Sequence, residues 1–367
     1  MGRVRFKELG IGSFFGSYVF ERAVPEGHFL RQLDKLVDWE EIRDRLLPLY
    51  LGGATAGRPP YDPVVMFKTE LLAYLYNLSE RQVEQFVNDS LSAKWFLGLA
   101  VDKRGPDHTS LTKFKNRIKK NGGEELLDDL LVTVVRMASE QGLELGEIQV
   151  VDSTHTLADV NVTKDDQRRK EGKARRDRGA RWGAKGKRRK RGMKKARPWY
   201  FYGYKAHMSM NAKAQLITSV SVTPGNAHDG KQFPDLVEKD VQQGLPVSIY
   251  SADRGYDDGE NHYLLEISDL HSAIILNRYR TEKKDKNKQK WIDLRNSPEY
   301  KAGKRERYKI ERKFGEAKQN HGLARCRHVG REGYMIQAYM TAIALNLKRM
   351  VKVVTGASLR GGATVMA

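Results

Sequence analysis

The stretch Glu147-Ile148-Gln149-Val150-Val151-Asp152 marks the point where the sequence changes from a helical pattern to a β pattern. Its apolar, β-branched residues run into an acidic one, which predicts a buried strand that ends on a carboxylate. Further strand-like segments alternate with helix-like segments downstream, and this alternation is typical of an α/β domain. We therefore expect an α/β domain to begin at residue 144, with Asp152 at the end of its first strand.

The rest of the expected α/β domain follows from the spacing of apolar residues, which differs between strands and helices. Aromatic or β-branched runs predict strands over 199–210, 215–222, 247–252 and 272–276. Apolar residues at helical spacing predict helices over 231–243, 257–267, 303–320 and 332–352. The segment 281–300 is polar and basic, which indicates an irregular loop.

Upstream of residue 144 the periodic segments are helical. Apolar residues recur every three to four positions over 26–50, 63–77, 80–90, 110–120 and 124–141. Pro63 is typical of a first helical position, Ser79 with Gln82 predicts a capping box, and Asp107 or Thr109 predicts another cap. We therefore expect three parts: an all-α domain over 1–143, the α/β domain over 144–352, and a tail over 353–367.

Positive charge is concentrated in one segment of the chain. The 367 residues carry a formal net charge of +20, and residues 161–198 hold 18 Lys and Arg against 4 Asp and Glu. The run 185–197 has no apolar period, so we expect a loop or disordered arm inserted into the α/β domain. Such charge density favours contact with nucleic-acid phosphates, with a solvated linker as the alternative. The DNA-binding candidates in this arm are Lys187, Arg188, Arg189, Lys190 and Arg191.

A second basic segment lies in the expected all-α domain. Residues 102–120 carry 7 basic and 2 acidic residues, and a turn separates their helix from an earlier one. Lys113, Lys115 and Arg117 would then lie on the second helix of a helix-turn-helix and reach the major groove. A solvated basic helix is the alternative.

The composition excludes several classes of protein. The single cysteine, Cys326, excludes a disulfide scaffold and a zinc finger. No apolar run approaches the roughly 18 residues that span a bilayer, and the first residues lack the apolar core of a signal peptide. We therefore expect a cytoplasmic, nucleoid-associated protein that has no membrane partner and no small-molecule substrate.

Two acidic residues follow expected strands. Asp152 ends the first strand, and Asp253 follows the strand over 247–252. Ligand sites of open α/β sheets gather at the carboxyl ends of strands, where two neighbouring carboxylates repel each other unless a cation lies between them. Oxygen ligands without clustered Cys or His favour Mg²⁺ or Mn²⁺. Taken singly, each aspartate is equally compatible with a helix cap.

A third acid lies on an expected helix. Arg307, Glu311 and Lys318 fall on one stripe of the helix over 305–320. This stripe is either a ladder of surface salt bridges or a metal-binding carboxylate flanked by phosphate-binding cations. Glu316 competes for the role of third acid, because Arg312 precedes it at the same spacing, but Leu323 stands where the following Lys would be.

Together these residues resemble a known enzyme family. Asp152, Asp253 and Glu311 resemble the DDE triad of bacterial insertion-sequence transposases. The pattern Arg307-x3-Glu311-x6-Lys318 is similar to the family's Y-x2-R-x3-E-x6-K signature, with Lys304 at the Tyr position. The resemblance covers roughly residues 25–350. Other segments that resemble the family are 58–63 through 111–114, 202–207, 223–229 and 252–256.

The resemblance implies a fold and a reaction. The fold would be a ribonuclease-H-like catalytic domain behind a helical DNA-binding and dimerisation domain. The enzyme would bind the terminal inverted repeats of an insertion sequence, cleave the DNA and join the freed 3′ ends to target DNA. Its double-stranded DNA partners are the transposon ends and the target, and synapsis of two ends makes a homodimer the expected assembly.

The resemblance also implies roles for single residues. Two Mg²⁺ or Mn²⁺ ions would be held by Asp152, which bridges both, with Asp253 on one and Glu311 on the other. Arg307 and Lys318 would hold phosphates, and Lys205 and His207 could touch DNA near the site. Two alternatives remain: a ribonuclease-H-like nuclease specific for DNA structure, and a non-catalytic DNA-binding protein derived from a transposase.

Overall fold

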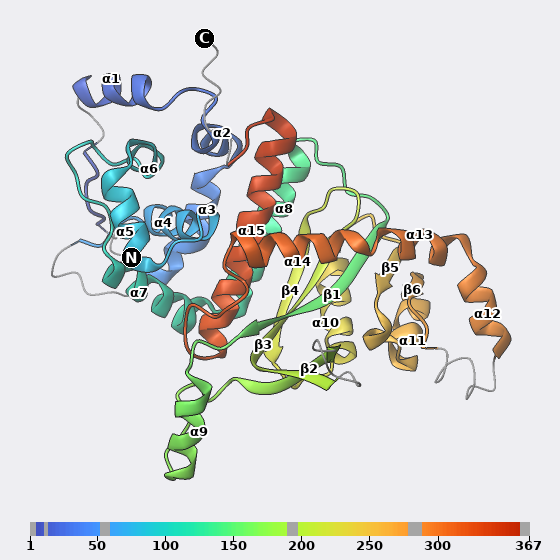
Figure 1. The fold of residues 1–367 in the computed structure, drawn as a ribbon. Coiled ribbons are helices and arrows are strands. Elements are labelled where there is room, and N and C mark those ends of the chain that lie inside the picture. The colour runs from blue at the N-terminus through green and yellow to red at the C-terminus, as the bar shows by residue number, and fades with distance from the viewer. Residues whose placement is uncertain (1–4, 11–13, 52–58, 189–196, 278–287, 360–367) are drawn as a thin grey trace. The chain divides into compact units, whose positions relative to one another are not determined.

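The computed structural model describes residues 5–10, 14–51, 59–188, 197–277 and 288–359 (Figure 1). The chain divides into a helical unit, Met1–Leu143 with Tyr339–Ala367, and a mixed α/β unit, Glu144–Ala338. The change of unit after Leu143 falls where the sequence pattern changes. Residues 339–352, which the sequence assigned to the α/β domain, cluster with the helical unit.

The helical unit is built from short helices and one long one. The long helix is α15 (Arg331–Thr355), whose first residues belong to the α/β unit. Across the described residues, no helix combines the length and the apolar composition needed to cross a membrane. The other helices are α1 (Phe14–Ala23), α2 (Phe29–Leu36), α3 (Trp39–Leu46), η1 (Leu47–Tyr50), α4 (Pro63–Leu75), α5 (Glu80–Asp89), α6 (Leu91–Phe96), α7 (His108–Arg117), η2 (Ile118–Gly122) and α8 (Gly123–Glu140).

Side-chain caps fix the starts of these helices. Pro63 is the first residue of α4, behind the N-cap Asp62. The capping box predicted at the start of α5 is confirmed, because Gln82 accepts a hydrogen bond from the backbone N–H of Ser79 at 2.9 Å while the Ser79 hydroxyl caps the Gln82 N–H. Asp107 caps α7 and accepts from the backbone N–H of Ser110 at 2.6 Å. Each cap satisfies N–H groups that lack a partner within the helix.

The α/β unit is built on a mixed sheet. Its strands lie in the order β4-β3-β1-β5-β6, with β1, β3 and β4 antiparallel and β5 and β6 parallel to β1. β2 pairs with the first half of β3, on the edge that β4 occupies farther along. This order is that of a ribonuclease-H-like domain, which confirms the predicted fold. The strands are β1 (Ile148–Leu157), β2 (Arg181–Arg188), β3 (Arg197–Asn211), β4 (Ile217–Pro224), β5 (Ile249–Ala252) and β6 (His271–Ile274).

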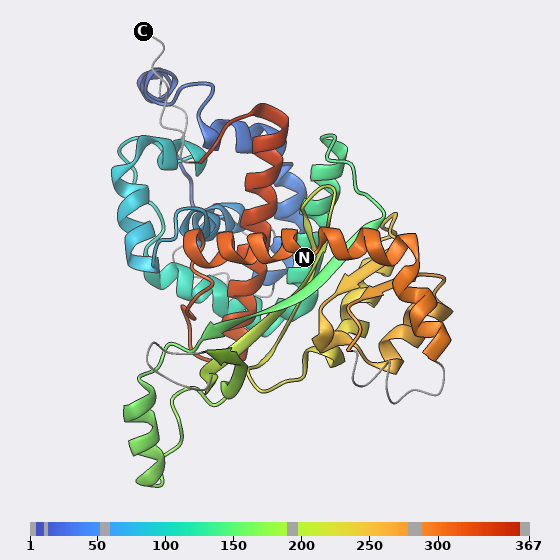
Figure 2. The same cartoon turned by 45° about the vertical axis from the view of Figure 1, so that its right-hand side comes forward.

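Helices cover both faces of the sheet because successive strand residues point to opposite sides. Tyr250 packs in the core beneath α10 (Phe233–Gln242) and α11 (Gly259–Ile267). Its neighbour Ile249 packs with Trp291 and Tyr300, which belong to α12 (Lys288–Asn296) and α13 (Pro298–Glu306). Figure 2 shows α14 (Tyr308–Asn320), which contacts β1, running across that strand.

The expectation of a loop or disordered arm over 185–197 is wrong for the part that the structure describes, because 185–188 belong to β2 and Arg197 begins β3. Residues 189–196 lie outside the described residues. The basic insertion over 161–198 contains two regular elements in its described part. It forms α9 (Val162–Lys170) and β2. Asn161 caps α9, and the buried Asp165 accepts from the backbone N–H of Arg176 at 2.9 Å. These bonds, and the pairing of β2 with β3, replace the hydrophobic core that the segment lacks.

The expected loop over 281–300 is also wrong where the structure describes it. α12 and the start of α13 occupy this region, because Trp291 and Tyr300 bury their rings against β5 and β6. The helix expected over 303–320 is divided, since α13 ends at Glu306 and α14 begins at Tyr308, with Arg307 in a helical conformation between them.

Candidate active site

Strand register brings the first two candidate acids together. β1 and β5 are parallel, with Val151 paired to Ala252. Asp152 and Asp253 each follow one member of this pair. The expectation that Asp152 ends the first strand is wrong, because β1 continues to Leu157 along β3. What brings the two aspartates together is that each directly follows the last residue pair of the parallel ladder between β1 and β5. Asp253 also caps a short helix, η4 (Arg254–Tyr256), and accepts from the backbone N–H of Gly255 at 2.7 Å.

The electrostatics of this edge favour a cation. Burial raises the pKa of Asp152 to about 7, and the negative charge of Asp253 adds to the rise. The backbone N–H of Ser153, which donates to Asp152 at 2.7 Å, and the charge of Arg307 act in the opposite direction. A raised pKa means that the ionised form of Asp152 lacks sufficient compensation from its surroundings.

The third candidate acid comes from α14. Glu311 lies one turn after Arg307, whose guanidinium donates to its carboxylate at 2.6 Å. Lys318 lies two turns farther on, and its ammonium is 3.4 Å from Nδ1 of His155. Burial, followed by the nearby charge of Lys185, lowers the pKa of Lys318 to about 8. The predicted stripe of Arg307, Glu311 and Lys318 therefore faces the sheet edge that carries the aspartates.

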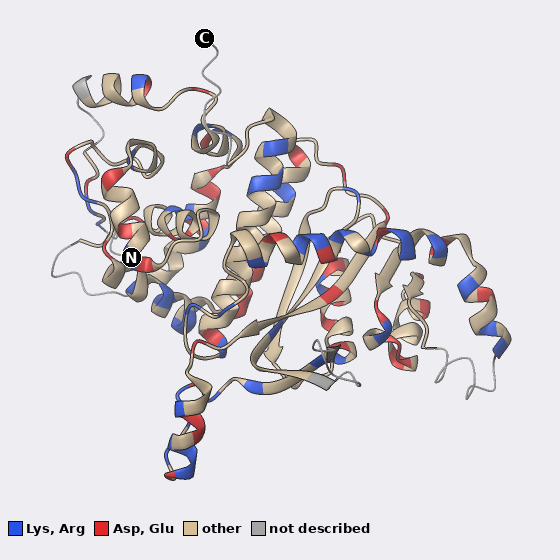
Figure 3. Cartoon of the chain, viewed as in Figure 1, with Lys and Arg blue, Asp and Glu red and all other residues tan. Residues whose placement is uncertain are grey.

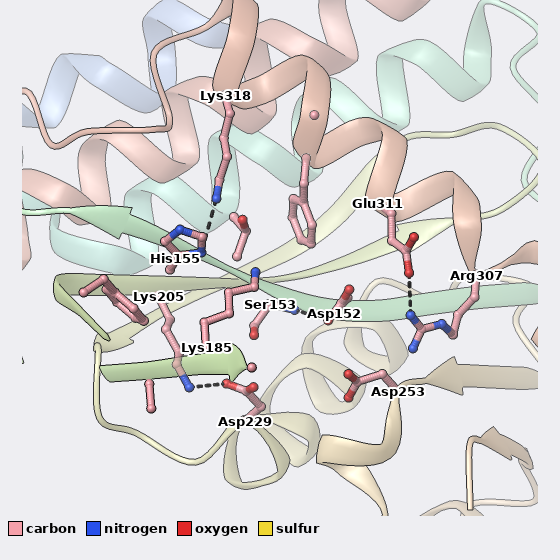
Figure 4. Close-up of a pocket in the computed structure, with 16 residues that line it drawn as sticks. Asp152, Ser153, His155, Lys185, Lys205, Asp229, Asp253, Arg307, Glu311 and Lys318 are labelled. Carbon is pink, nitrogen blue, oxygen red and sulfur yellow. Dashed lines mark hydrogen bonds and ion pairs between the residues drawn. The ribbon is translucent and has the colours of Figure 1, made fainter. Parts of the chain in front are cut away.

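The three acids, Arg307 and Lys318 line one cavity of about 660 Å³ (Figure 4). Its walls come from β1, from the β2–β3 hairpin, from the loops after β4 and β5, and from α14. The residues that line it are Asp152, Ser153, Thr154, His155, Ala184, Lys185, Gly186, Phe201, Lys205, Asp229, Asp253, Arg307, Glu311, Phe314, Gly315 and Lys318. The rival third acid, Glu316, is not among them and lies 3.5 Å from Lys313.

The three carboxylates are the type of ligand that a hard divalent cation prefers, but their side chains do not surround a common point in this structure. Among the described residues, no three His, Cys, Asp or Glu side chains lie close enough together to hold a metal ion. Asp152 and Asp253 supply two adjacent oxygen donors, whereas Glu311 is paired with Arg307 in this conformation. The donor set suits Mg²⁺ or Mn²⁺, provided that Glu311 turns away from Arg307.

The two candidates on β3 lie at different depths. Lys205 lines the cavity and donates to Asp229 at 2.8 Å. His207 is fully buried, with Nε2 2.8 Å from the hydroxyl of Thr223. The prediction that His207 touches DNA therefore does not fit this structure, because the ring is fully buried although it shares a face of β3 with Lys205.

The basic helix of the helical unit is also only partly available to DNA. Lys113 on α7 is exposed, but Lys115 is buried and pairs with Glu70 at 2.8 Å and with Glu80. Arg117 lies over the ring of Tyr50, 4.2 Å from its centroid. The prediction of a DNA contact does not fit Lys115, since the helix turns this position into the core.

The basic insertion reaches the cavity through Ala184, Lys185 and Gly186, and the sequence does not single out the charged member, Lys185. Lys185 on β2 lines the cavity, while Lys187 and Arg188 follow on the same strand. Arg189, Lys190 and Arg191 lie outside the described residues. Figure 3 shows Lys and Arg positions distributed along α9 and α14.

Three polar cavity residues have no place in the site predicted from the sequence. The sequence allows Asp229 to line the site but favours a loop-capping role for it. His155 lies three positions after Asp152 on β1, so the strand period gives no reason to place it beside that residue. Lys185 carried no signal of its own within a uniformly basic run.

Comparisons with known proteins agree with these observations. The family described as "Transposase domain (DUF772)" matches residues 18–117, and the family described as "Transposase DDE domain" matches residues 144–347. Among solved structures, "Mos1 transposase paired-end complex with left transposon end" is similar at 11% identity over 75% of this chain and 83% of that chain, with a TM-score of 0.20. "Crystal structure of the Mos1 mariner paired end complex with Mn" is similar at 12% identity over 94% of this chain and 96% of that chain, with a TM-score of 0.21. Because these TM-scores are too low to show a shared fold, the family assignment rests on the two family matches.

Proposed function

The chain belongs to the DDE transposase family, and from this premise we propose that it binds the terminal inverted repeats of an insertion sequence, cleaves the DNA and transfers the freed strands. The observation that carries the proposal is the convergence of Asp152, Asp253 and Glu311 on one cavity. These acids come from β1, from the loop after β5 and from α14, and an accidental set of capping residues would not line a single cavity.

Asp152, Asp253 and Glu311 would hold the two divalent metal ions. Bound Mg²⁺ or Mn²⁺ would supply activation of the attacking oxygen and stabilisation of the leaving oxygen. The pKa of Asp152 supports a cation here, because burial and Asp253 leave this carboxylate under-compensated. Glu311 is 58% exposed on its side chain, so it is free to rotate toward the aspartates once Arg307 finds another anion.

The cations of α14 provide the anion-binding part of the site. Arg307 offers a planar fork of donors that matches two phosphate oxygens, and its side chain is only 16% exposed. Lys318 lies farther along the cavity, beside His155. A scissile phosphate bound by Arg307 would compete with Glu311 for the guanidinium, so that DNA binding and release of Glu311 are coupled.

DNA on either side of the cavity would meet the rest of the positive charge. Lys185 lies at the cavity, and the exposed residues Arg169 and Lys170 belong to α9 of the same unit. Lys113 and neighbouring residues of the helical unit would contribute to binding of the inverted repeat. We propose a homodimer for the assembly that holds two transposon ends.

A joining assay tests the proposal. A labelled inverted-repeat end, Mg²⁺ and a target plasmid are incubated with the wild-type protein, and we expect a joined product. Cleavage without joining would support the structure-specific nuclease, and binding without either reaction would support the non-catalytic DNA-binding protein.

Single substitutions test the three acids. We expect Asp152→Asn, Asp253→Asn and Glu311→Gln each to abolish cleavage while DNA binding persists. Glu316→Gln is the matched control, because Glu316 shares α14 with Glu311 but does not line the cavity. Full cleavage by Asp152→Asn, or loss of cleavage in Glu316→Gln alone, would contradict the proposed triad.

A further inference from the structure

The cavity holds a fourth carboxylate that the proposed reaction does not use. Asp229 begins a short helix, η3 (Asp229–Gln232), and its Oδ1 accepts a hydrogen bond from the Lys205 ammonium at 2.8 Å (Figure 4). The same ammonium donates to the carbonyl of Ala227 at 2.7 Å. Both Lys205 and Asp229 line the cavity, and their side chains are 14% and 27% exposed. The pair is therefore partly shielded from solvent and is screened less by salt than one on an open surface.

A buried histidine lies behind the pair. Lys205 and His207 are two positions apart on β3, so both point to the same face of the sheet. Nε2 of His207 is 2.8 Å from the Thr223 hydroxyl, and Nδ1 lies 3.9 Å from Oδ1 of Asp229 with no hydrogen-bond partner among the described residues. Burial lowers the pKa of His207 to about 4, so the ring is neutral at neutral pH. The ring therefore carries no charge, and it does not compete with the Lys205 ammonium for the carboxylate of Asp229.

Asp229 also borders the proposed metal-binding acids. A Cβ atom at Gly255 would lie 2.9 Å from Oδ1 of Asp253 and 3.8 Å from Oδ2 of Asp229. The pKa of the buried Tyr256 hydroxyl is raised first by burial and then by the charges of Asp152, Asp229 and Asp253. The Lys205–Asp229 pair is thus part of the same electrostatic environment as the reaction centre.

We propose that Asp229 is a positioning residue that holds the Lys205 ammonium in place to bind a DNA phosphate in the cavity. A lysine head has three N–H donors on a flexible four-carbon stem, and two of the donors of Lys205 are engaged by Asp229 and Ala227. The third donor is left for the cavity. Because Asp229 and Ala227 already fix the ammonium, the Lys205 side chain loses less conformational entropy when it binds a phosphate. This inference rests on the proposed function.

Equilibrium binding separates this role from simple neutralisation of charge. Removal of a carboxylate next to a DNA site ordinarily tightens binding, because the repulsion of phosphate disappears. If Asp229 positions Lys205, Asp229→Asn should instead weaken binding of a transposon-end duplex, measured in Ca²⁺ so that no cleavage interferes. We expect Lys205→Met to weaken binding by a similar factor and to lower the salt slope by about one. Asp235→Asn, an exposed change on α10 away from the cavity, is the control for loss of one negative charge.

The double variant and the conservative variant complete the test. Single-turnover cleavage should fall about 100-fold in Asp229→Asn and in Lys205→Met, the loss that misplacement of a reacting group by about 1 Å produces. The variant with both changes should cleave no more slowly than either alone, because the two residues act as one unit. Asp229→Glu, which keeps the charge, should recover part of the rate. The thermal unfolding midpoint should be unchanged in each variant.

Three results would overturn the inference. Tighter DNA binding by Asp229→Asn would show that the carboxylate only repels phosphate. Multiplicative losses in the double variant would show that the residues act independently. A higher Mg²⁺ requirement in Asp229→Asn but not in Lys205→Met would make Asp229 a metal ligand. If the wild-type protein neither cleaves nor joins, the proposed function fails, and the binding measurements still decide the role of Asp229.

Discussion

Replacement of Lys115 by methionine should destabilise the helical unit without a direct effect on DNA binding. The Lys115 side chain is 5% exposed, and its ammonium lies 2.8 Å from the carboxylate of Glu70, which is 4% exposed. Glu80, at 26% exposure, completes the group. Burial lowers the pKa of Lys115, but the charges and hydrogen bonds of its partners outweigh this effect and raise it overall. The residue is therefore a charged component of the core.

The magnitude follows from what the substitution leaves behind. Methionine fills much the same volume, so the cost comes mainly from Glu70, whose carboxylate stays buried without its cation. Breaking one side of a buried pair costs about 3–5 kcal/mol, whereas replacing both partners by neutral groups is often close to neutral. We therefore expect Glu70→Gln combined with Lys115→Met to be markedly more stable than Lys115→Met alone.

Hydrogen exchange followed by mass spectrometry measures this locally in the full chain. Peptides from α4 and α7 should exchange about 100-fold to 4,000-fold faster in Lys115→Met, since about 1.4 kcal/mol corresponds to a factor of ten. Lys113→Met, on the exposed side of the same helix, is the control and should leave exchange unchanged. Unchanged exchange in Lys115→Met together with weaker DNA binding would refute the reasoning and restore the helix-turn-helix interpretation for this residue.

Three other predictions follow from single features of the α/β unit. Burial raises the pKa of Asp240 to about 6, although the hydroxyls of Ser209 and Thr218 donate to it. The native state therefore binds an extra proton, and the free energy of unfolding should fall by about 3 kcal/mol as pH rises from about 4 to 6. Urea unfolding measured across that range should show this fall in the wild-type protein and a flatter profile in Asp240→Asn. A Cβ atom at Gly203 would lie 2.0 Å from the backbone oxygen of Thr156, so Gly203→Ala should lower the thermal midpoint clearly while Gly259→Ala, which meets nothing within 4 Å, should not. Replacing Arg169 and Lys170 on α9 by glutamine should reduce the salt slope of DNA binding by about two, and an unchanged slope would show that α9 does not contact phosphates.

The sequence predicts most reliably where one local rule decides. The capping box at Ser79 and Gln82 needs only two side chains and one turn of helix, and it forms as expected. The closeness of Asp152 and Asp253 depends only on the parallel pairing of β1 with β5, although Asp152 lies within β1 and not at its end as the sequence predicted. Both kinds of inference use interactions between residues close in sequence or paired by a regular ladder.

Predictions failed where tertiary contacts override composition. The insertion over 161–198 carries too few apolar residues for a core, yet Asp165 and the ladder to β3 order its described part. Lys115 and His207 have the composition of DNA-contacting residues, but packing buries both. The periodicity of the sequence does not reveal that Glu70 forms an ion pair with Lys115, because the two residues are 45 positions apart.

The charge of the chain and the charge of the cavity have separate functions. The side chains that line the cavity include the acids Asp152, Asp229, Asp253 and Glu311 and the bases Lys185, Lys205, Arg307 and Lys318. The described lining is therefore balanced, although the chain carries a net charge of +20. A balanced cavity exerts little long-range pull on DNA, so attraction must come mainly from the basic insertion and other surfaces. Within the cavity, two of the cations are paired with acids of the same cavity: Lys205 donates to Asp229, and Arg307 donates to Glu311. We therefore expect net charge to govern the approach of DNA and these paired side chains to govern which phosphate is bound.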